Sequence, residues 1–148
     1  MPEKSTLRRA RRDKRQGKAP STQAGEFVRE EMHHVREGKH GARSTKQAIA
    51  IGLSKARRSG VKLRPPRRAK ASTKRSAKYA SRAARRHAQP STRRASGVRR
   101  ALKREGRSAA SRKNLSRQAR GAARRRSSSS RSAAARRAAR TRRRRASA

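Results

Sequence analysis

The large apolar residues of this 148-residue chain are concentrated in one short segment, and this concentration limits what the chain can fold into. Residues 21–63 hold nine of the fifteen Val, Ile, Leu, Met, Phe and Tyr residues. A core needs buried apolar surface to offset the entropy that is lost on ordering. Residues 21–63 are therefore the segment expected to fold, between a basic N-terminal arm (1–20) and a low-complexity basic tail (64–148).

The first part of this segment has the pattern of an amphipathic helix. Pro20, Ser21 and Thr22 are typical of a helix start, and Gly38 is typical of a helix end. The apolar residues between them recur at helical spacing within an arc of roughly 140°. They are Ala24, Phe27, Val28, Met32 and Val35.

A second helix is predicted after the loop "GKHGAR". Ser44 and Gln47 have the spacing of a capping box, and Gly60 is a suitable C-terminal cap. Gly52 lowers helix stability at an interior position, but in the middle of the apolar face it would let the first helix approach closely. That face consists of Ala48, Ile49, Gly52, Leu53 and Ala56.

The two helices predict an αα-hairpin whose core contains Phe27, Ile49 and Leu53. A segment of 43 residues usually needs further support, and Ile51 points away from the predicted apolar face. Two sources of support remain open: Val61 and Leu63 fold back over Ile51, which we favour, or a second copy of the chain covers it as a weak homodimer.

The rest of the chain is predicted to be poorly ordered. A helix over 5–16, closed by Gly17, has no apparent apolar face, and 64–148 is rich in Arg, Ala and Ser. The predicted fold class is therefore mostly α: a small αα-hairpin followed by a long, largely disordered tail with helix-prone segments. The sequence of residues 90–126 weakly repeats that of the hairpin, so a degenerate second hairpin is kept as an alternative for this segment.

The charge balance points to a polyanionic partner. The chain has 49 Lys and Arg residues against 7 Asp and Glu, for a formal net charge of +42. Arg outnumbers Lys 37 to 12, and guanidinium groups suit phosphate recognition. The absence of cysteine excludes disulfides and thiolate metal sites, and no apolar run is long enough for a membrane span or a secretory signal.

Nucleic-acid contacts are predicted on the outer face of the second helix, in the "LRPPRR" segment and in the tail. The helix face could read bases through Gln47 and Arg58, but phosphate contact is the favoured interpretation. The predicted binding residues are Lys46, Gln47, Lys55, Arg57, Arg58, Arg64, Arg67, Arg68, Arg124, Arg125, Arg126, Arg142, Arg143, Arg144 and Arg145.

The first helix also carries an acidic face that invites a metal-site interpretation. Glu26, Glu30, His33 and Glu37 lie opposite the apolar face, and Glu-x-x-His spacing occurs at 30/33, 31/34 and 37/40. Such spacing binds metals when several helices direct it into a bundle core, and no second acidic helix exists here. The favoured interpretation is a solvated face, or a docking strip for the chain's own arginines. We predict no metal, no cofactor and no catalytic residue.

The stretch "STQAGEFVREEMHHVREGKHGARSTKQAIAIGLSKARRSGVKL" resembles a bacterial domain of unknown function numbered 6496, over about residues 1–65, and "STKQAIAIGLSKAR" is its most specific part. The family consists of short basic proteins with Lys/Ala- or Arg/Ala-rich tails, and the tail is similar to those of bacterial linker-histone-like proteins. The resemblance implies a DNA-associated protein of the bacterial cytoplasm.

These observations together predict a non-enzymatic, largely sequence-independent DNA-binding protein of the nucleoid that acts by phosphate neutralisation. Two alternatives remain: an RNA- or ribosome-associated basic protein, and a protein-interaction module whose tail anchors it to nucleic acid.

Overall fold

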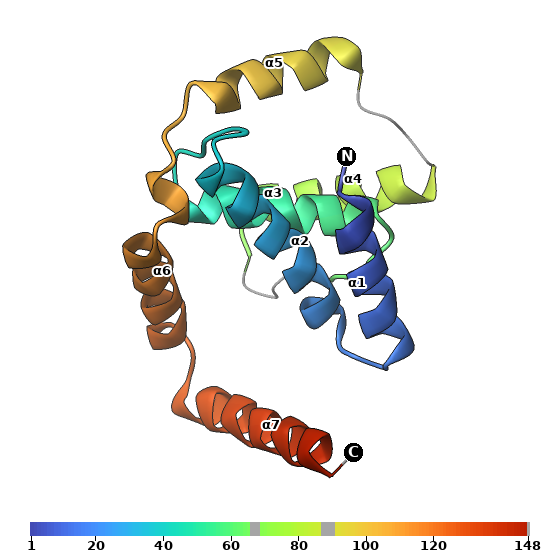
Figure 1. The fold of residues 1–148 in the computed structure, drawn as a ribbon, viewed down its shortest axis with the longest axis vertical. Helices are drawn as coiled ribbons and strands as arrows, with labels where there is room; N and C mark the ends of the chain where they lie inside the picture. The colour runs from blue at the N-terminus through green and yellow to red at the C-terminus, as the bar shows by residue number, and fades with distance from the viewer. Residues whose placement is uncertain (66–68, 87–90, 148) are drawn as a thin grey trace. The chain divides into compact units, whose positions relative to one another are not determined.

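The structure, a computed structural model, describes residues 1–65, 69–86 and 91–147. The chain divides into two compact units, Met1–Ser111 and Arg112–Ala148. Within the described residues all regular structure is helical (Figure 1). The elements are α1 (Lys4–Arg15), α2 (Pro20–Arg36), α3 (Thr45–Arg58), α4 (Ala71–Arg85), α5 (Thr92–Lys103), the short 3-10 helix η1 (Ser108–Ala110), α6 (Arg112–Arg124) and α7 (Ser128–Ala146).

The prediction of a largely disordered tail is wrong, because four α-helices and η1 cover most of the described part of 64–148. Ala and Arg both have high helix propensity. In addition, α4 buries Ala77, Ala80 and Ala83 and packs against α3. Disorder was predicted because large apolar side chains are scarce in this part of the chain. In α4, alanines spaced three apart form the buried face instead.

The core of the first unit lies where α1, α2 and α3 meet. Figure 1 shows α2 crossing α3, with α1 alongside α2. Phe27 is its largest apolar side chain and is 1% exposed. Small residues surround the ring, with Ala10 from α1, Ala24 from α2 and Ala56 from α3 in the same cluster. Because most of the partners are alanines, the backbones of the three helices can approach closely.

The closest approach of α2 and α3 is at Gly52. A Cβ built on Gly52 would lie 2.7 Å from the Cα atom of Val28 and 3.0 Å from the carbonyl oxygen of Phe27. Real Cβ atoms essentially never come so close to a backbone atom. The predicted role of Gly52 as the contact point between the hairpin helices is therefore confirmed.

The predicted hairpin core is confirmed at Phe27 and corrected at two other positions. Ile49 and Leu53 are only half-buried, although Leu53 packs against the Phe27 cluster. The fully buried apolar residues of α3 are Ala48 and Ala56, because the close contact at Gly52 leaves little room for larger side chains. Val61 and Leu63 also pack on this cluster, while Ile51 stays half-buried.

The start of α3 has the predicted cap. Ser44 is the N-cap, and its Oγ accepts a hydrogen bond of 3.2 Å from the backbone N–H of Gln47. The side chain of Gln47 reaches back one residue beyond the usual capping box, where its Oε1 accepts a 2.7 Å bond from the N–H of Arg43. Two backbone donors at the helix start are satisfied in this way.

The predicted N-terminal helix is present as α1, and Gly17 just after it has a φ of +65°. Its surface differs from the prediction, because the helix does have a packing face. Ala10 belongs to the core cluster, Leu7 packs against it, and Thr6 is completely buried. One leucine and one alanine are enough to pack α1 against the core, because α1 meets the small residues of α2.

Residues 102–110 return to the loop between α2 and α3. The N–H groups of Gly41 and Ala42 donate hydrogen bonds of 2.9 and 3.0 Å to the carbonyls of Leu102 and Gly106. The Thr45 hydroxyl donates a 2.6 Å bond to the carbonyl of Ala109, which is buried. This segment, called the return segment below, is thus fixed to the hairpin mainly by backbone hydrogen bonds.

The degenerate hairpin considered for 90–126 is replaced by α5 and α6, which belong to different compact units. No residue of α5 or α6 is buried. Among the described residues, no helix is both long enough and apolar enough to cross a membrane.

Candidate nucleic-acid interface

The acidic side chains of α1 and α2 are paired with cations of the first unit. Arg9 Nε lies 2.7 Å from Glu26 Oε2, and Lys18 Nζ lies 2.6 Å from Asp13 Oδ1. The predicted solvated acidic face is therefore wrong in part, because α1 covers it. The alternative interpretation, a docking strip for the chain's own arginines, describes the contact of Arg9 with Glu26.

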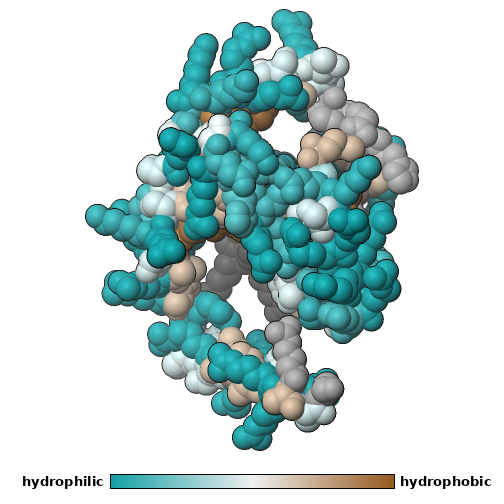
Figure 2. Space-filling view, in the orientation of Figure 1, coloured by the Kyte–Doolittle hydropathy of each residue, from teal (hydrophilic) through white to brown (hydrophobic). Residues whose placement is uncertain are grey.

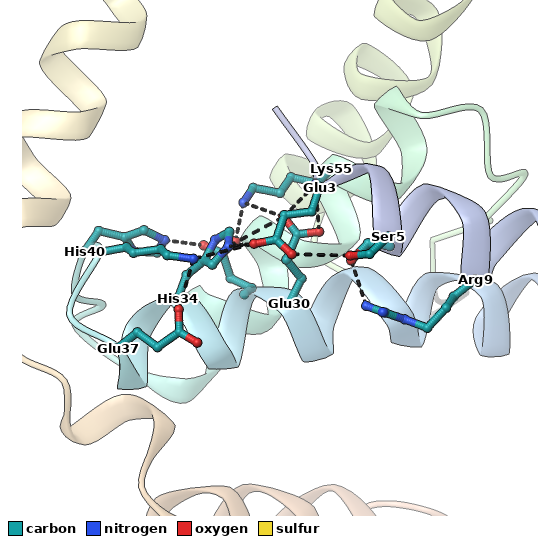
Figure 3. A network of polar contacts seen from close by, with 11 residues as sticks. Glu3, Ser5, Arg9, Glu30, His34, Glu37, His40 and Lys55 are labelled. Carbon is teal, nitrogen blue, oxygen red and sulfur yellow. Dashed lines mark hydrogen bonds and ion pairs between the residues drawn. The ribbon is translucent and has the colours of Figure 1, made fainter.

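Two further acids of this face are buried in a polar network (Figure 3). Glu31 is completely buried and Glu30 is 3% exposed. Lys55 Nζ of α3 lies 2.6 Å from Glu31 Oε2, and His40 Nε2 lies 3.1 Å from Glu31 Oε1. The Glu30 carboxylate accepts from the backbone N–H of Glu3 at 3.3 Å. The network therefore joins α2, α3, the loop between them and the N-terminus.

His34 and Lys39 extend the network to the surface. His34 Nε2 lies 3.0 Å from Glu3 Oε1, and this hydrogen bond, together with the charge of Lys39, lowers the pKa of Glu3. Lys39 Nζ lies 3.0 Å from Glu37 Oε2, which lowers the pKa of Glu37 and raises that of Lys39. Among the residues that the structure describes, six of the seven acids thus have a basic partner within ion-pair distance.

Three of the predicted nucleic-acid contacts have other roles in the fold. Gln47 caps α3, and Lys55 is the ion-pair partner of the buried Glu31. Arg57 is 8% exposed, and its Nε donates a 3.1 Å bond to the carbonyl of Leu63. Burial lowers the pKa of the Arg57 guanidinium. Sequence spacing placed Gln47 and Arg57 on the outer face of α3, but the segment after α3 covers Arg57.

Other predicted contacts near the hairpin are accessible. Lys46 and Arg64 are exposed. Arg58 is half-buried, with its guanidinium carbon 5.7 Å from the centre of the Tyr79 ring of α4. The predicted contacts Arg67 and Arg68 lie outside the described residues.

The predicted tail contacts belong to helices or their ends. Arg124 ends α6 and is exposed, as are Arg125 and Arg126 that follow it. The Arg126 guanidinium donates a 3.4 Å bond to the carbonyl of Ser130 in the first turn of α7. The remaining predicted contacts lie near the end of α7 and are Arg142, Arg143, Arg144 and Arg145. The first three of these are exposed.

The exposed cations of α4 were not among the predicted nucleic-acid contacts. The buried alanine face of this helix directs its basic residues away from α3, and Figure 2 shows hydrophilic residues over most of the visible surface. The spacing of Ala77, Ala80 and Ala83 was the signal that could have revealed an ordered, one-sided helix. Its exposed cations are Lys74, Arg75, Lys78, Arg82 and Arg85.

The comparisons with known proteins agree with the resemblance seen in the sequence. Residues 15–68 match the model of a family of unknown function, DUF6496. The matched segment begins at the end of α1 and contains α2 and α3, so the hairpin is the part that the family model describes. The searches of curated proteins and of solved structures gave no match.

Proposed function

We propose that this chain is a non-enzymatic nucleic-acid-binding protein that neutralises phosphates largely independently of sequence, with duplex DNA as its ligand and the bacterial nucleoid as its location. The hairpin with α1 is the folded base of the protein. The helices after it present the cations. Binding of this type depends on the number and exposure of Lys and Arg side chains rather than on their matching to bases.

The observation that carries the proposal is the separation of paired from unpaired charge. The acids Glu3, Asp13, Glu26, Glu30, Glu31 and Glu37 are all paired within the first unit. Residues 112–148 contain fifteen Lys and Arg residues and no acid. The cations of this unit therefore have no acid in their own unit to pair with, and a polyanion would relieve their mutual repulsion.

Helix α4 supports the same proposal from within the first unit. Its alanine face is buried against α3, and its five exposed cations are displayed by a fixed helix. Cations on an ordered helix lose less backbone entropy on binding than cations on a disordered chain. Phosphate contact by α4 therefore benefits from the fold of the hairpin.

The test is a salt titration of binding to duplex DNA and to duplex RNA, run side by side on the full-length chain. Each phosphate neutralised contributes about −0.9 to the slope of log affinity against log salt concentration. Replacing Arg142, Arg143 and Arg144 by Ala should make the slope shallower by up to about 2.7 if all three contact phosphates. The matched control replaces the same three residues by Lys, which keeps the charge and should leave the slope close to that of the parent.

Three results would count against the proposal. Equal slopes for the Ala and Lys variants and the parent would mean that the end of α7 does not neutralise phosphates. A marked preference for duplex RNA would favour an RNA- or ribosome-associated protein. A shallow slope for both duplexes would favour a protein-interaction module.

A further inference from the structure

The polar network of α2 contains three groups that together have the character of a metal site. Glu31 and His34 are three residues apart on α2, and His40 follows in the loop before α3. One ligand atom from each residue can be chosen so that all three lie within 4.8 Å of one another. From this geometry we propose that Glu31, His34 and His40 bind a zinc ion.

The distances are close to those that zinc requires. At Zn–N and Zn–O bonds of about 2.0–2.1 Å, tetrahedral ligand atoms are separated by roughly 3.4 Å. The pair formed by His40 Nε2 and Glu31 Oε1 is already at 3.1 Å. All three ligand atoms lie within 4.8 Å of one another, so the remaining approach is at most about 1.4 Å.

The hydrogen bond of His40 determines which of its nitrogens can bind. Nδ1 lies 3.0 Å from the carbonyl oxygen of Gly41. A carbonyl can only accept, so Nδ1 carries the hydrogen. In the neutral ring the lone pair is then on Nε2, which faces the Glu31 carboxylate. Two lone-pair atoms at this distance need a proton or a metal ion between them, and a backbone partner on the other nitrogen is the usual support of a zinc-bound histidine.

The Glu31 carboxylate is the second independent indication. It is completely buried, and within the described part of the chain neither of its oxygens has a partner that meets hydrogen-bond geometry. It lies close to Lys55 and His40, yet a buried carboxylate normally has well-directed donors as well. Lys55 Nζ is beside Oε2, while Oε1 faces the histidines. A zinc ion on Oε1 would therefore leave Lys55 in place as the partner of the other oxygen.

The donor set and the surroundings favour zinc over the abundant hard cations. Two imidazoles and one carboxylate suit Zn²⁺, whereas Mg²⁺ and Ca²⁺ prefer oxygen ligands alone. His40 also lines a surface pocket bordered by Glu37 and Lys103. The fourth position is available to solvent or to Glu3, whose Oε1 lies 3.0 Å from His34 Nε2.

Zinc at this position would fix the end of α2 to the loop that receives the return segment. Gly41, next to His40, donates its N–H to Leu102. A metal ligand one residue away would restrict the loop in the conformation that makes this bond. The inference goes beyond the proposed function, since the site contains none of the cations that are proposed to contact phosphates.

The experiment measures zinc binding to the full-length chain after treatment with a chelator and in the absence of nucleic acid. Isothermal titration should show one zinc ion per chain, and the melting temperature should rise with zinc but not with magnesium. His34→Ala and His40→Ala should each weaken zinc binding by more than about tenfold. His33→Ala is the matched control, because His33 is on the same helix and exposed, and it should bind zinc like the parent.

A second readout guards against variants that fail to fold. Cobalt in place of zinc should give the visible absorption of a tetrahedral site in the parent and in His33→Ala, and His40→Gln should lose it while its helical circular dichroism stays unchanged. Zinc binding that is equally weakened in the His33 and His40 variants would overturn the proposal. Binding of several ions without saturation, or a cobalt spectrum typical of six oxygen ligands, would overturn it as well.

Discussion

Replacing Gly52 by Ala should destabilise the protein although alanine is the better helix former. The added methyl group would lie 2.7 Å from the Cα atom of Val28 and 3.0 Å from the Phe27 carbonyl oxygen. Both are backbone atoms of α2, so the clash can be relieved only by moving one helix away from the other. Inserting a methylene into a well-packed contact costs about 1–3 kcal/mol, and the gain in helix propensity returns up to about 1 kcal/mol.

The structure offers a matched control for this prediction. Gly25 lies inside α2, is exposed, and a Cβ built on it would meet nothing within 4 Å. Gly25→Ala should therefore stabilise the protein by about 0.5–1 kcal/mol, since only the propensity term acts. The two substitutions are chemically identical, so the difference between them isolates the contact of α2 with α3.

Urea denaturation followed by circular dichroism measures both variants. We expect Gly25→Ala to be more stable than Gly52→Ala by about 1–3 kcal/mol, which is the cost of the clash, because both variants gain the same helix propensity. A shift of about 2–4 °C in melting temperature per kcal/mol makes the same difference visible on heating. If Gly52→Ala were as stable as Gly25→Ala, the close approach of the two helices would be refuted.

Three other predictions concern the core, the return segment and the cap of α3. Phe27→Ala should cost about 3–5 kcal/mol and the half-buried Leu53→Ala about 1–2 kcal/mol, measured by urea denaturation; the reverse order would contradict the observed core. Gly41→Ala would place a Cβ against the Glu105 carbonyl, so hydrogen exchange at the Ala42 amide should accelerate, and unchanged exchange would show that the return segment does not depend on this contact. Ser44→Ala should cost about 1 kcal/mol, and an unaltered melting curve would argue against the cap.

The hairpin was predictable from the sequence because its signals are local. The Ser44 cap and the helical spacing around Phe27 depend on residues near one another in the chain, and the close contact at Gly52 joins two helices that one short loop connects. The tail was predicted wrongly because its order depends on alanine. Ala77 or Ala109 contributes little apolar area alone, and its burial follows from a partner that is distant in sequence.

For the candidate sites as well, local features could be predicted from the sequence and contacts between distant segments could not. The basic character of the chain could be read from composition, but not which cations the fold uses internally. Lys55 was predicted to contact nucleic acid and is instead the partner of Glu31. The Glu-x-x-His spacing at 31/34 was visible in the sequence, whereas the position of His40 depends on how the loop turns back toward α2.

The return segment has a consequence for how a polyanion would be held. Helix α5 lies in the chain between two fixed points, the contact of α4 with α3 and the hydrogen bonds of Gly41 and Ala42. A duplex that contacts Arg93 or Arg100 of α5 would therefore be linked through the same chain to the cations of α4. Once the duplex is bound to α5, its contact with α4 becomes intramolecular. A short tether raises the effective concentration for that contact to the millimolar range. Two weak helices fixed in this way would act as one bivalent ligand, and releasing the return segment would reduce avidity without removing a single charge.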